Sequence, residues 1–193
     1  MKKIISSALF IAGFFAMASC NDSSNTEKKE TDSKEVAKDQ NDKKFDSTNI
    51  EGDTKFAVNI ADAGMMEVKA GQLAQKNGSN AKVKEFGKMM EADHSKAGDE
   101  LKTTAQKKNL SLPSVLGEDH QKKYDDLAKL KGAAFDKKYA DMMVNGHKDV
   151  IDMFEKEASS GNDADLKAWA SSMLPTLKHH MEMAQAMKDA VNK

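Results

Sequence analysis

The sequence predicts an all-α protein, and three observations lead to this prediction. Only two prolines and two tyrosines occur in 193 residues. After residue 54, Ala, Lys, Met, Leu, Glu and Asp dominate, and most of these favour helices over strands. Apolar residues also recur there with the helical period in four long stretches. A chain of this length is expected to form one domain with a sizeable core.

The N-terminal segment has the features of a secretory signal. Two lysines precede the apolar run IISSALFIAGFFAMAS, which is too short and wrongly flanked for a stable membrane span. The following MASC resembles the lipobox of bacterial lipoproteins, in which cleavage exposes a cysteine that becomes lipidated, although Met17 replaces the usual leucine. We therefore expect residues 1–19 to be a lipoprotein signal peptide and Cys20 to be lipidated. Ordinary signal peptidase cleavage, which would leave an idle thiol, is the alternative.

Residues 20–52 are predicted to be a disordered tether. In the stretch NDSSNTEKKETDSKEVAKDQNDKKFDSTN, only Val36, Ala37 and Phe45 are apolar, so it cannot bury enough surface to fold. A flexible coil of this length spans roughly 30 Å, which would hold a domain away from a lipid surface. Acyl chains on Cys20 would make the membrane the partner of this segment. Cys20 is the single cysteine, so neither an internal disulfide nor a cysteine-based metal site is expected.

Residues 53–193 are predicted to be a helical bundle domain, and its first half holds two long helices. The first follows the capping sequence GDT and ends near Gly78, which is expected to supply a left-handed cap. The second begins after Ser79 or Asn80 and ends near Asn109.

The second half is predicted to hold one short and two long helices. Pro113 prevents helix continuation through LSLPSVLG, and a short helix follows over residues 118–130. The third long helix stops at Gly161, and Asp163 caps the fourth. Pro175 is the weakest point of this fourth helix and can bend it.

Two tight turns and a longer middle connection predict an antiparallel four-helix bundle with an additional short helix. The turns at Gly78 and Gly161 would lie at the same end. No internal repeat or glycine-rich phosphate loop is evident. The net charge of −1 indicates no nucleic-acid partner and no anionic surface as a target.

Each of the four long helices carries one titratable side chain on its apolar stripe, namely Glu67, His94, His147 and His180. At about 100° per residue, each lies roughly 20–40° from apolar or small neighbours on the helical wheel. At a rise of about 1.5 Å per residue, the first three lie roughly 16–22 Å below their turns, whereas His180 lies roughly 28 Å below and is the outlier. The four side chains are therefore expected to converge on one layer of the core.

Four such groups in a core must satisfy one another or bind a cation, because an unpartnered buried charge is costly. Glu67, His94, His147 and His180 are a suitable ligand set for a transition metal such as Zn²⁺, Cu²⁺ or Fe²⁺, the identity being open. The alternative is a metal-free polar network that fixes helix register in a non-catalytic structural or protein-interaction module. No catalytic residue is assigned.

A further carboxylate pair precedes His94. Glu91 and His94 have the Glu-x-x-His spacing of di-iron bundles, but Val144 and Leu177 occupy the positions where a second such motif would need a glutamate. A standard di-iron enzyme is therefore not expected. Glu91 and Asp93 are instead expected to lie behind the ligands and orient an imidazole.

Methionine is unusually frequent, with 13 in the chain. Met90 and His94 are four residues apart, as are Met143 and His147, so each pair shares a helix face. Thioether with imidazole favours soft Cu(I) or Ag(I) and suggests copper scavenging. The favoured interpretation is that methionine fills gaps in the core.

Four segments between Lys55 and Met187 resemble a known family. They are ADAGMMEVKAGQLA, VKEFGKMMEADHSKAGDEL, LKGAAFDKKYADMMVNGHKDVIDMFEKEA and LPTLKHHMEMA. The family is domain of unknown function 4142, whose members are ferritin-like envelope proteins often labelled predicted outer membrane proteins.

The resemblance implies a ferritin-like bundle exported to the bacterial cell envelope. The family's recurring Glu, Asp-His, His and late His fall on Glu67, Asp93-His94, His147 and His180. The family has no settled activity. We therefore expect a lipoprotein anchored at the outer membrane and facing the periplasm, with a bundle that binds a transition metal for storage, buffering or sensing.

Overall fold

The computed structural model describes residues 32–193, and these residues fold into helices without strands, as the sequence predicts. The helices are α1 (Ser33–Phe45), α2 (Glu51–Asn77), α3 (Ala81–Lys108), α4 (Glu118–Ala128), α5 (Gly132–Ser160) and α6 (Ala164–Val191). The predicted signal peptide, residues 1–19, and the predicted lipidation site Cys20 lie outside the described residues. Among residues 32–193, no helix has both the length and the apolar character that a membrane crossing requires.

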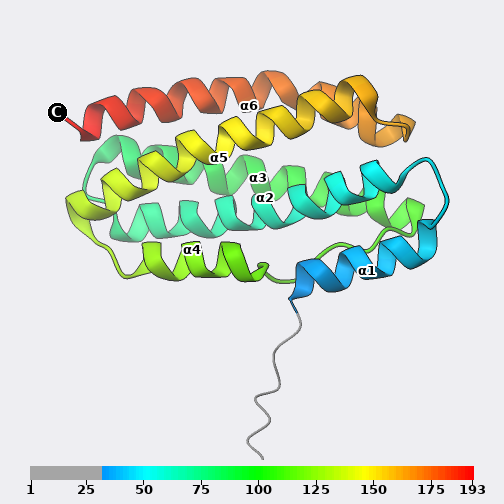
Figure 1. Cartoon of the computed structure of the whole chain (residues 1–193). Coiled ribbons are helices and arrows are strands. Elements are labelled where there is room, and N and C mark those ends of the chain that lie inside the picture. The colour runs from blue at the N-terminus through cyan, green and yellow to red at the C-terminus, as the bar shows by residue number, and fades with distance from the viewer. Residues whose placement is uncertain (1–31) are drawn as a thin grey trace, which may run out of the picture. The chain divides into compact units, whose positions relative to one another are not determined.

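The four long helices pack as two antiparallel hairpins (Figure 1). Helices α2 and α3 form one hairpin, and α5 and α6 form the other. The hairpins meet mainly where α2 packs on α5 and α3 packs on α6. The short helices α1 and α4 both pack on α2, and Figure 1 shows them following one another along it.

Each hairpin turn is held by an aspartate from the other hairpin. The carboxylate of Asp136, in the first turns of α5, accepts hydrogen bonds from the backbone N–H groups of Ser79 at 3.0 Å and Asn80 at 2.9 Å. Asp53, at the start of α2, accepts one from the N–H of Asn162 at 2.9 Å. The same number of positions separates Asp53 from the first turn and Asp136 from the second. The hairpins are thus built alike, a repeat that the sequence analysis did not identify.

The prediction of a left-handed cap at Gly78 is wrong. Gly78 has φ −66° and Gly161 has φ −60°, which any residue can adopt. Glycine is needed for space instead, because an added Cβ would lie 2.6 Å from the carbonyl oxygen of Ala74 at the first turn and 2.6 Å from Oε1 of Glu157 at the second. The left-handed cap occurs at Asn109, which ends α3 with φ 56°.

The prediction of a disordered tether over residues 20–52 is wrong for the part of the chain that forms α1. This helix has few apolar residues, but its Asn41 is only 1% exposed. The amide of Asn41 donates to the carbonyl oxygen of Ser111 at 2.8 Å and accepts from the Ser111 N–H at 2.7 Å. Asp32 caps α1 and also accepts from the N–H of Glu118 at 3.1 Å. Composition missed α1 because polar bonds to distant segments dock it together with only two apolar side chains, Ala37 and Phe45.

The observed boundaries differ from the predicted ones in three further places. The packed helices begin with α1 at Ser33, not at residue 53. Helix α2 begins at Glu51, so Asp53 lies inside it and accepts a hydrogen bond from the α5–α6 turn. Helix α4 ends at Ala128. Helix α6 continues through Pro175 without a break, and this continuity sets the position along the bundle axis of every residue after Pro175.

The apolar core is divided into two clusters. One surrounds Phe86, Phe135 and Tyr139, and the other surrounds Phe56 and Phe154. Along α3, α5 and α6, residues of one cluster give way to residues of the other at His94, His147 and His180. On α2 the change lies between Ala63 and Met65, just before the buried Glu67.

Candidate metal centre

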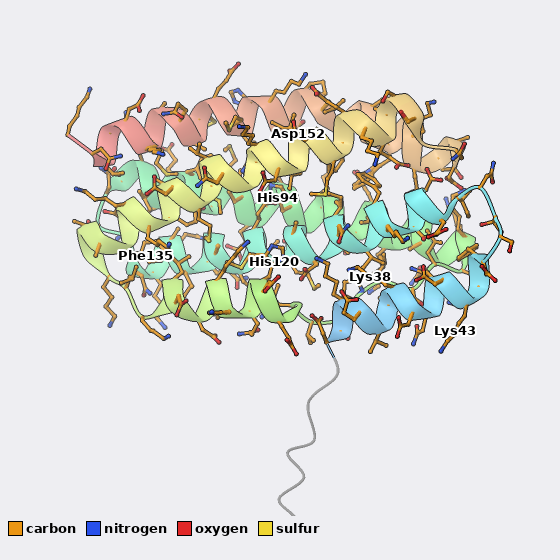
Figure 2. All side chains as sticks on the ribbon, viewed as in Figure 1. Lys38, Lys43, His94, His120, Phe135 and Asp152 are labelled. Atoms are coloured by element: carbon orange, nitrogen blue, oxygen red, sulfur yellow. The ribbon has the colours of Figure 1, made fainter. Side chains whose placement is uncertain are left out.

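The four predicted site residues lie together in the layer between the two core clusters. Their exposed fractions are 5% for Glu67, 7% for His94, 0% for His147 and 2% for His180. Figure 2 shows His94 between the long helices, in contrast to Lys43 on the outer side of α1. His180, the outlier in predicted depth, lies in the same layer as the others because α6 is continuous through Pro175.

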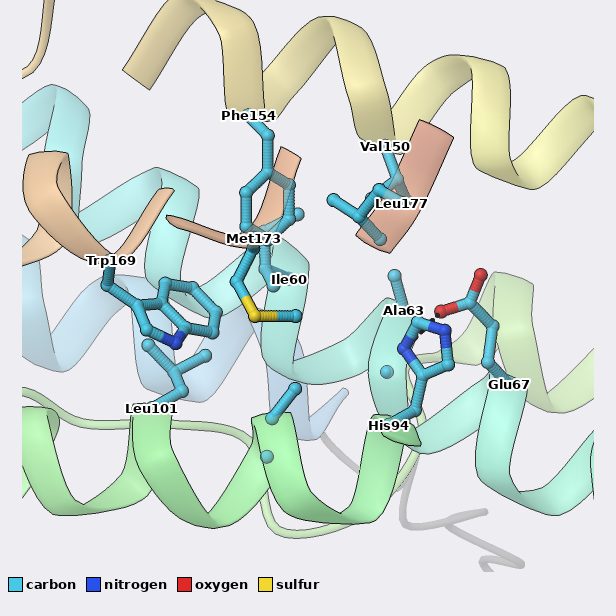
Figure 3. A pocket seen from close by; sticks show the side chains of 13 residues that line it. Ile60, Ala63, Glu67, His94, Leu101, Val150, Phe154, Trp169, Met173 and Leu177 are labelled. Carbon is cyan, nitrogen blue, oxygen red and sulfur yellow. Dashed lines mark ion pairs between the residues drawn. The ribbon is translucent and has the colours of Figure 1, made fainter. Parts of the chain in front are cut away.

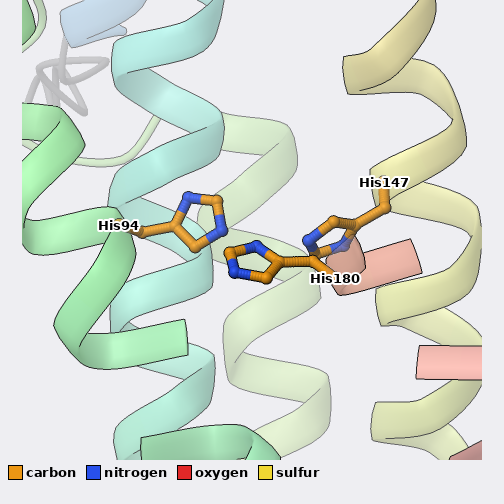
Figure 4. A group of neighbouring side chains, drawn as sticks. All are labelled: His94, His147 and His180. Atoms are coloured by element: carbon orange, nitrogen blue, oxygen red, sulfur yellow. The ribbon is translucent and has the colours of Figure 1, made fainter. Parts of the chain in front are cut away.

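The three imidazoles form a nearly equilateral triangle (Figure 4). The ring centroids are 5.8 Å apart for His94 and His147, 5.4 Å for His94 and His180, and 5.6 Å for His147 and His180. Each ring offers one nitrogen that lies within 4.8 Å of the nitrogens offered by the other two. One cation between the rings could therefore contact all three after small side-chain rotations.

Each imidazole uses one nitrogen to hold its orientation. Nδ1 of His94 lies 3.0 Å from Oε2 of Glu67, and Nδ1 of His147 lies 2.9 Å from the carbonyl oxygen of Met143. Nε2 of His180 lies 3.0 Å from Oδ2 of Asp93. Because the facing atoms are all acceptors, each of these nitrogens carries the proton. This places the lone pair of a neutral ring on its other nitrogen.

Those other nitrogens have no hydrogen-bond partner within the described part of the chain. They are Nε2 of His94, Nε2 of His147 and Nδ1 of His180, and all three are buried. A buried polar atom without a partner is costly and requires an explanation. Metal-ligating histidines almost always donate their second nitrogen to a carboxylate or carbonyl, as these do.

The carboxylate of Glu67 contacts two of the imidazoles. Its Oε2 lies 3.0 Å from Nδ1 of His94, and its Oε1 lies 3.5 Å from Nδ1 of His147. Glu67 therefore lies where it orients two rings and supplies negative charge. The structure thus brings Glu67 together with the three histidines, as the sequence predicts.

The two other predicted carboxylates have different positions. Asp93 contacts His180 on another helix, which is the orienting position expected of it. Glu91 does not reach any imidazole. Its carboxylate accepts from the side-chain amides of Gln72 at 2.9 Å and Gln75 at 2.6 Å. In this fold the glutamate of Glu-x-x-His is therefore bound to two glutamines of α2.

The electrostatics of the site favour a cation. Burial alone would raise the pKa of Glu67, but the charges of His94 and His147 and the bond to His94 lower it to about 2. Burial opposes the charge on His94, yet Glu67 at 3.0 Å raises the pKa of that imidazole above its usual value. Burial lowers the pKa of His180 to about 4, so this ring is neutral at pH 7. An anionic carboxylate beside imidazoles that can be neutral gives the site a net charge complementary to a divalent cation.

Aromatic and apolar side chains surround the site. Phe86 contacts the edge of the His147 ring at a centroid distance of 6.4 Å and that of Tyr139 at 6.2 Å. Burial and the nearby Glu67 raise the pKa of the Tyr139 hydroxyl, which stays protonated. Met90 and Met143, which share faces with two of the histidines, are buried in the first core cluster. Their burial among apolar neighbours is what the gap-filling interpretation predicts.

Glu67 also forms part of the wall of a surface groove. The groove has a volume of about 640 Å³ and runs between α2 and α5, with Met66, Met142 and Asp149 among its lining residues. Since Glu67 reaches it, the groove connects solvent with the polar layer.

Two other buried polar groups were not predicted from sequence. Asp62 is 1% exposed and accepts a hydrogen bond from the N–H of Gly117 at 2.9 Å. Its Oδ2 also lies 2.8 Å from Nδ1 of His120. Asp53 and Glu157 are both buried near the α5–α6 turn. Asp62 lies outside the central stripe of α2, so only the packing of α1 and α4 reveals its burial. Asp53 and Glu157 each lie seven residues, or about 20° of helix rotation, from the apolar Ile60 and Val150, so the helical period could have indicated their burial.

Comparison with known proteins agrees with the resemblance noted in the sequence. No curated protein and no solved structure matches the chain. A family model described as Domain of unknown function (DUF4142) matches residues 31–187, which include α1 to α5 and most of α6. The chain therefore belongs to the DUF4142 family.

Proposed function

We propose that the helical domain binds one transition-metal ion through His94, His147 and His180 and serves in metal storage, buffering or sensing. The observation that carries this proposal is the group of three buried imidazoles, each of which offers one nitrogen within 4.8 Å of those offered by the other two. Each ring also has one buried nitrogen without a hydrogen-bond partner in the described residues. Three imidazoles leave a fourth position open in a tetrahedral site, and imidazole suits Zn, Cu and Fe. Glu67 and Asp93 would orient the rings.

The helix arrangement supports a ferritin-like bundle as the scaffold of this site. Each ligand comes from a different long helix, so the metal would join α3 of one hairpin to α5 and α6 of the other. Metal binding would thereby stabilise the contact between hairpins. The groove that reaches Glu67 supplies a route from solvent. Because the proton on His94 competes with the ion, the apparent affinity would rise with pH.

Adjacent histidines on α6 give a matched test. His180 is buried in the site, whereas His179 is exposed. The wild-type domain and His179→Gln should retain one metal equivalent after dialysis against Zn²⁺, Cu²⁺ or Fe²⁺, while His180→Gln should lose it. At free metal 100-fold above Kd, the ion should add about 2.7 kcal/mol to the unfolding free energy of the first two proteins only.

Elemental analysis and thermal unfolding with and without chelator measure both effects. No bound metal in the wild type, or equal uptake by His180→Gln, would overturn the proposal. In that case the same side chains form a metal-free network that fixes helix register.

We also propose that the domain is a lipoprotein anchored in the cell envelope through Cys20, at the outer membrane and facing the periplasm. The support is the MASC sequence after the apolar N-terminal run. Protein isolated from its own host should begin at Cys20 and carry the mass of acyl chains, and Cys20→Ala should move it from the membrane to the soluble fraction. Mass spectrometry of an unmodified Cys20 peptide would reject the anchor, independently of the metal result.

A further inference from the structure

A small apolar pocket adjoins the candidate metal centre on the side of the second core cluster. Its cavity has a volume of about 30 Å³ and is lined by residues of all four long helices. Figure 3 shows Glu67 and His94 at one end and Phe154 and Trp169 at the other. Apart from Glu67 and His94, the residues that line it are apolar side chains and two glycines.

An unpartnered nitrogen belongs to the wall of this pocket. His94 is 7% exposed, and its Nε2 has no hydrogen-bond partner anywhere in residues 32–193. The same atom is one of the three nitrogens that would hold the metal. The pocket therefore lies against one of the ligands of the proposed metal.

Small residues keep the pocket open at the seam between α2 and α3. Ala63 and Gly64 line it from α2, and Ala97 and Gly98 line it from α3. A Cβ added at Gly64 or Gly98 would meet no heavy atom within 4 Å. Glycine in the middle of a helix is less stable than alanine, so this space is kept at a cost in helix stability. Because Gly98 is exposed, the pocket reaches the surface at this seam.

The size and polarity of the pocket limit what it can hold. A volume of about 30 Å³ has room for roughly two water molecules, or for one molecule of two or three heavy atoms. Apolar cavities stay dry and take up apolar guests such as xenon, whereas an ion would lose its hydration without compensation.

We propose that this pocket admits a small uncharged molecule of the size of dioxygen or carbon monoxide to the metal held by the three histidines. The part of this proposal that concerns the metal rests on the function proposed above. The part that concerns the pocket does not, since an apolar guest needs no metal.

Two mid-helix glycines provide the test and its control. Gly64 lines the pocket, whereas Gly146 on α5 lines the larger groove, and neither has a heavy atom within 4 Å of an added Cβ. Gly64→Leu should fill the pocket and Gly146→Leu should not. Ala97→Leu fills it from the opposite wall and repeats the test should Gly64→Leu fold poorly.

Xenon probes the metal-free protein by the shift of its NMR signal. Wild type and Gly146→Leu should bind xenon, and the pocket-filling variants should not. Carbon monoxide probes the Cu(I)-loaded protein by its infrared stretching band, and Gly64→Leu should weaken its binding at least tenfold with unchanged copper content.

Absence of xenon binding in the wild type, or equal carbon monoxide affinity in wild type and Gly64→Leu at equal copper content, would overturn the inference. A wild type that binds xenon but retains no copper would instead refute the metal function and leave the pocket standing.

Discussion

Replacing Asp136 with alanine should lower the free energy of unfolding by about 3–5 kcal/mol. Asp136 is 3% exposed, and its carboxylate accepts from the N–H of Ser79, the hydroxyl of Ser79 and the N–H of Asn80. Each bond to a charged group is worth about 1.5–3 kcal/mol, and the substitution removes all three of them at once. Because Asp136 belongs to α5, the substitution would also free the α2–α3 turn from the other hairpin.

Denaturant unfolding of Asp136→Ala and of Asp152→Ala measures this effect. Asp152 is an exposed aspartate on the same helix, so its loss should change stability by less than about 0.5 kcal/mol. Asp53→Ala should cost less than Asp136→Ala, since Asp53 accepts from a single N–H, that of Asn162. Equal stability of Asp136→Ala and Asp152→Ala would contradict the role assigned to this turn.

Replacing Glu157 with glutamine should remove a pH dependence from the stability of the domain. Glu157 is 5% exposed, and neither its Oε1 nor Oδ2 of the buried Asp53 accepts a hydrogen bond from any other group in the described chain. Burial, together with the hydrogen bond and charge of Asp53, raises the pKa of Glu157 to about 8. Glu157 is therefore protonated at neutral pH and donates to the carboxylate of Asp53.

The sign of the effect follows from proton binding. The ordinary pKa of this glutamate is 4.5, so between about 4.5 and 8 the folded protein holds a proton that the unfolded chain releases. The contribution of Glu157 to stability is complete below pH 4.5 and is lost as the pH rises toward 8. Glutamine carries a permanent donor toward Asp53 and does not titrate.

Glu157→Gln should therefore match the wild type near pH 5 and exceed its unfolding free energy near pH 8.5 by about 2–4 kcal/mol, because each pKa unit is worth about 1.4 kcal/mol. Thermal or denaturant unfolding across this range measures the difference. The control is Glu85→Gln, which changes an exposed glutamate on α3 and should leave the pH profile unaltered. Parallel profiles for wild type and Glu157→Gln would show that the pair does not hold an extra proton.

The long helices and the members of the polar layer could be predicted from the sequence. Helical periodicity is a local property, so the position of His94 or His147 on an apolar stripe predicted its burial without any knowledge of neighbouring helices. The same argument identified Glu67 and His180. It failed for α1, because Asn41 docks that helix through backbone bonds to a connection distant in sequence.

Only the tertiary structure decided how these residues act together. The height of His180 depended on whether α6 bends at Pro175, and the continuous helix brings its ring to within 5.6 Å of the other two. The tertiary structure also decided that the carboxylate of Glu67 contacts Nδ1 of His94. Period and composition determine which face of a helix is buried, because they depend on a residue and its near neighbours. The direction of a ring nitrogen, the partner of a carboxylate and the protonation of Glu157 depend on atoms that other helices contribute.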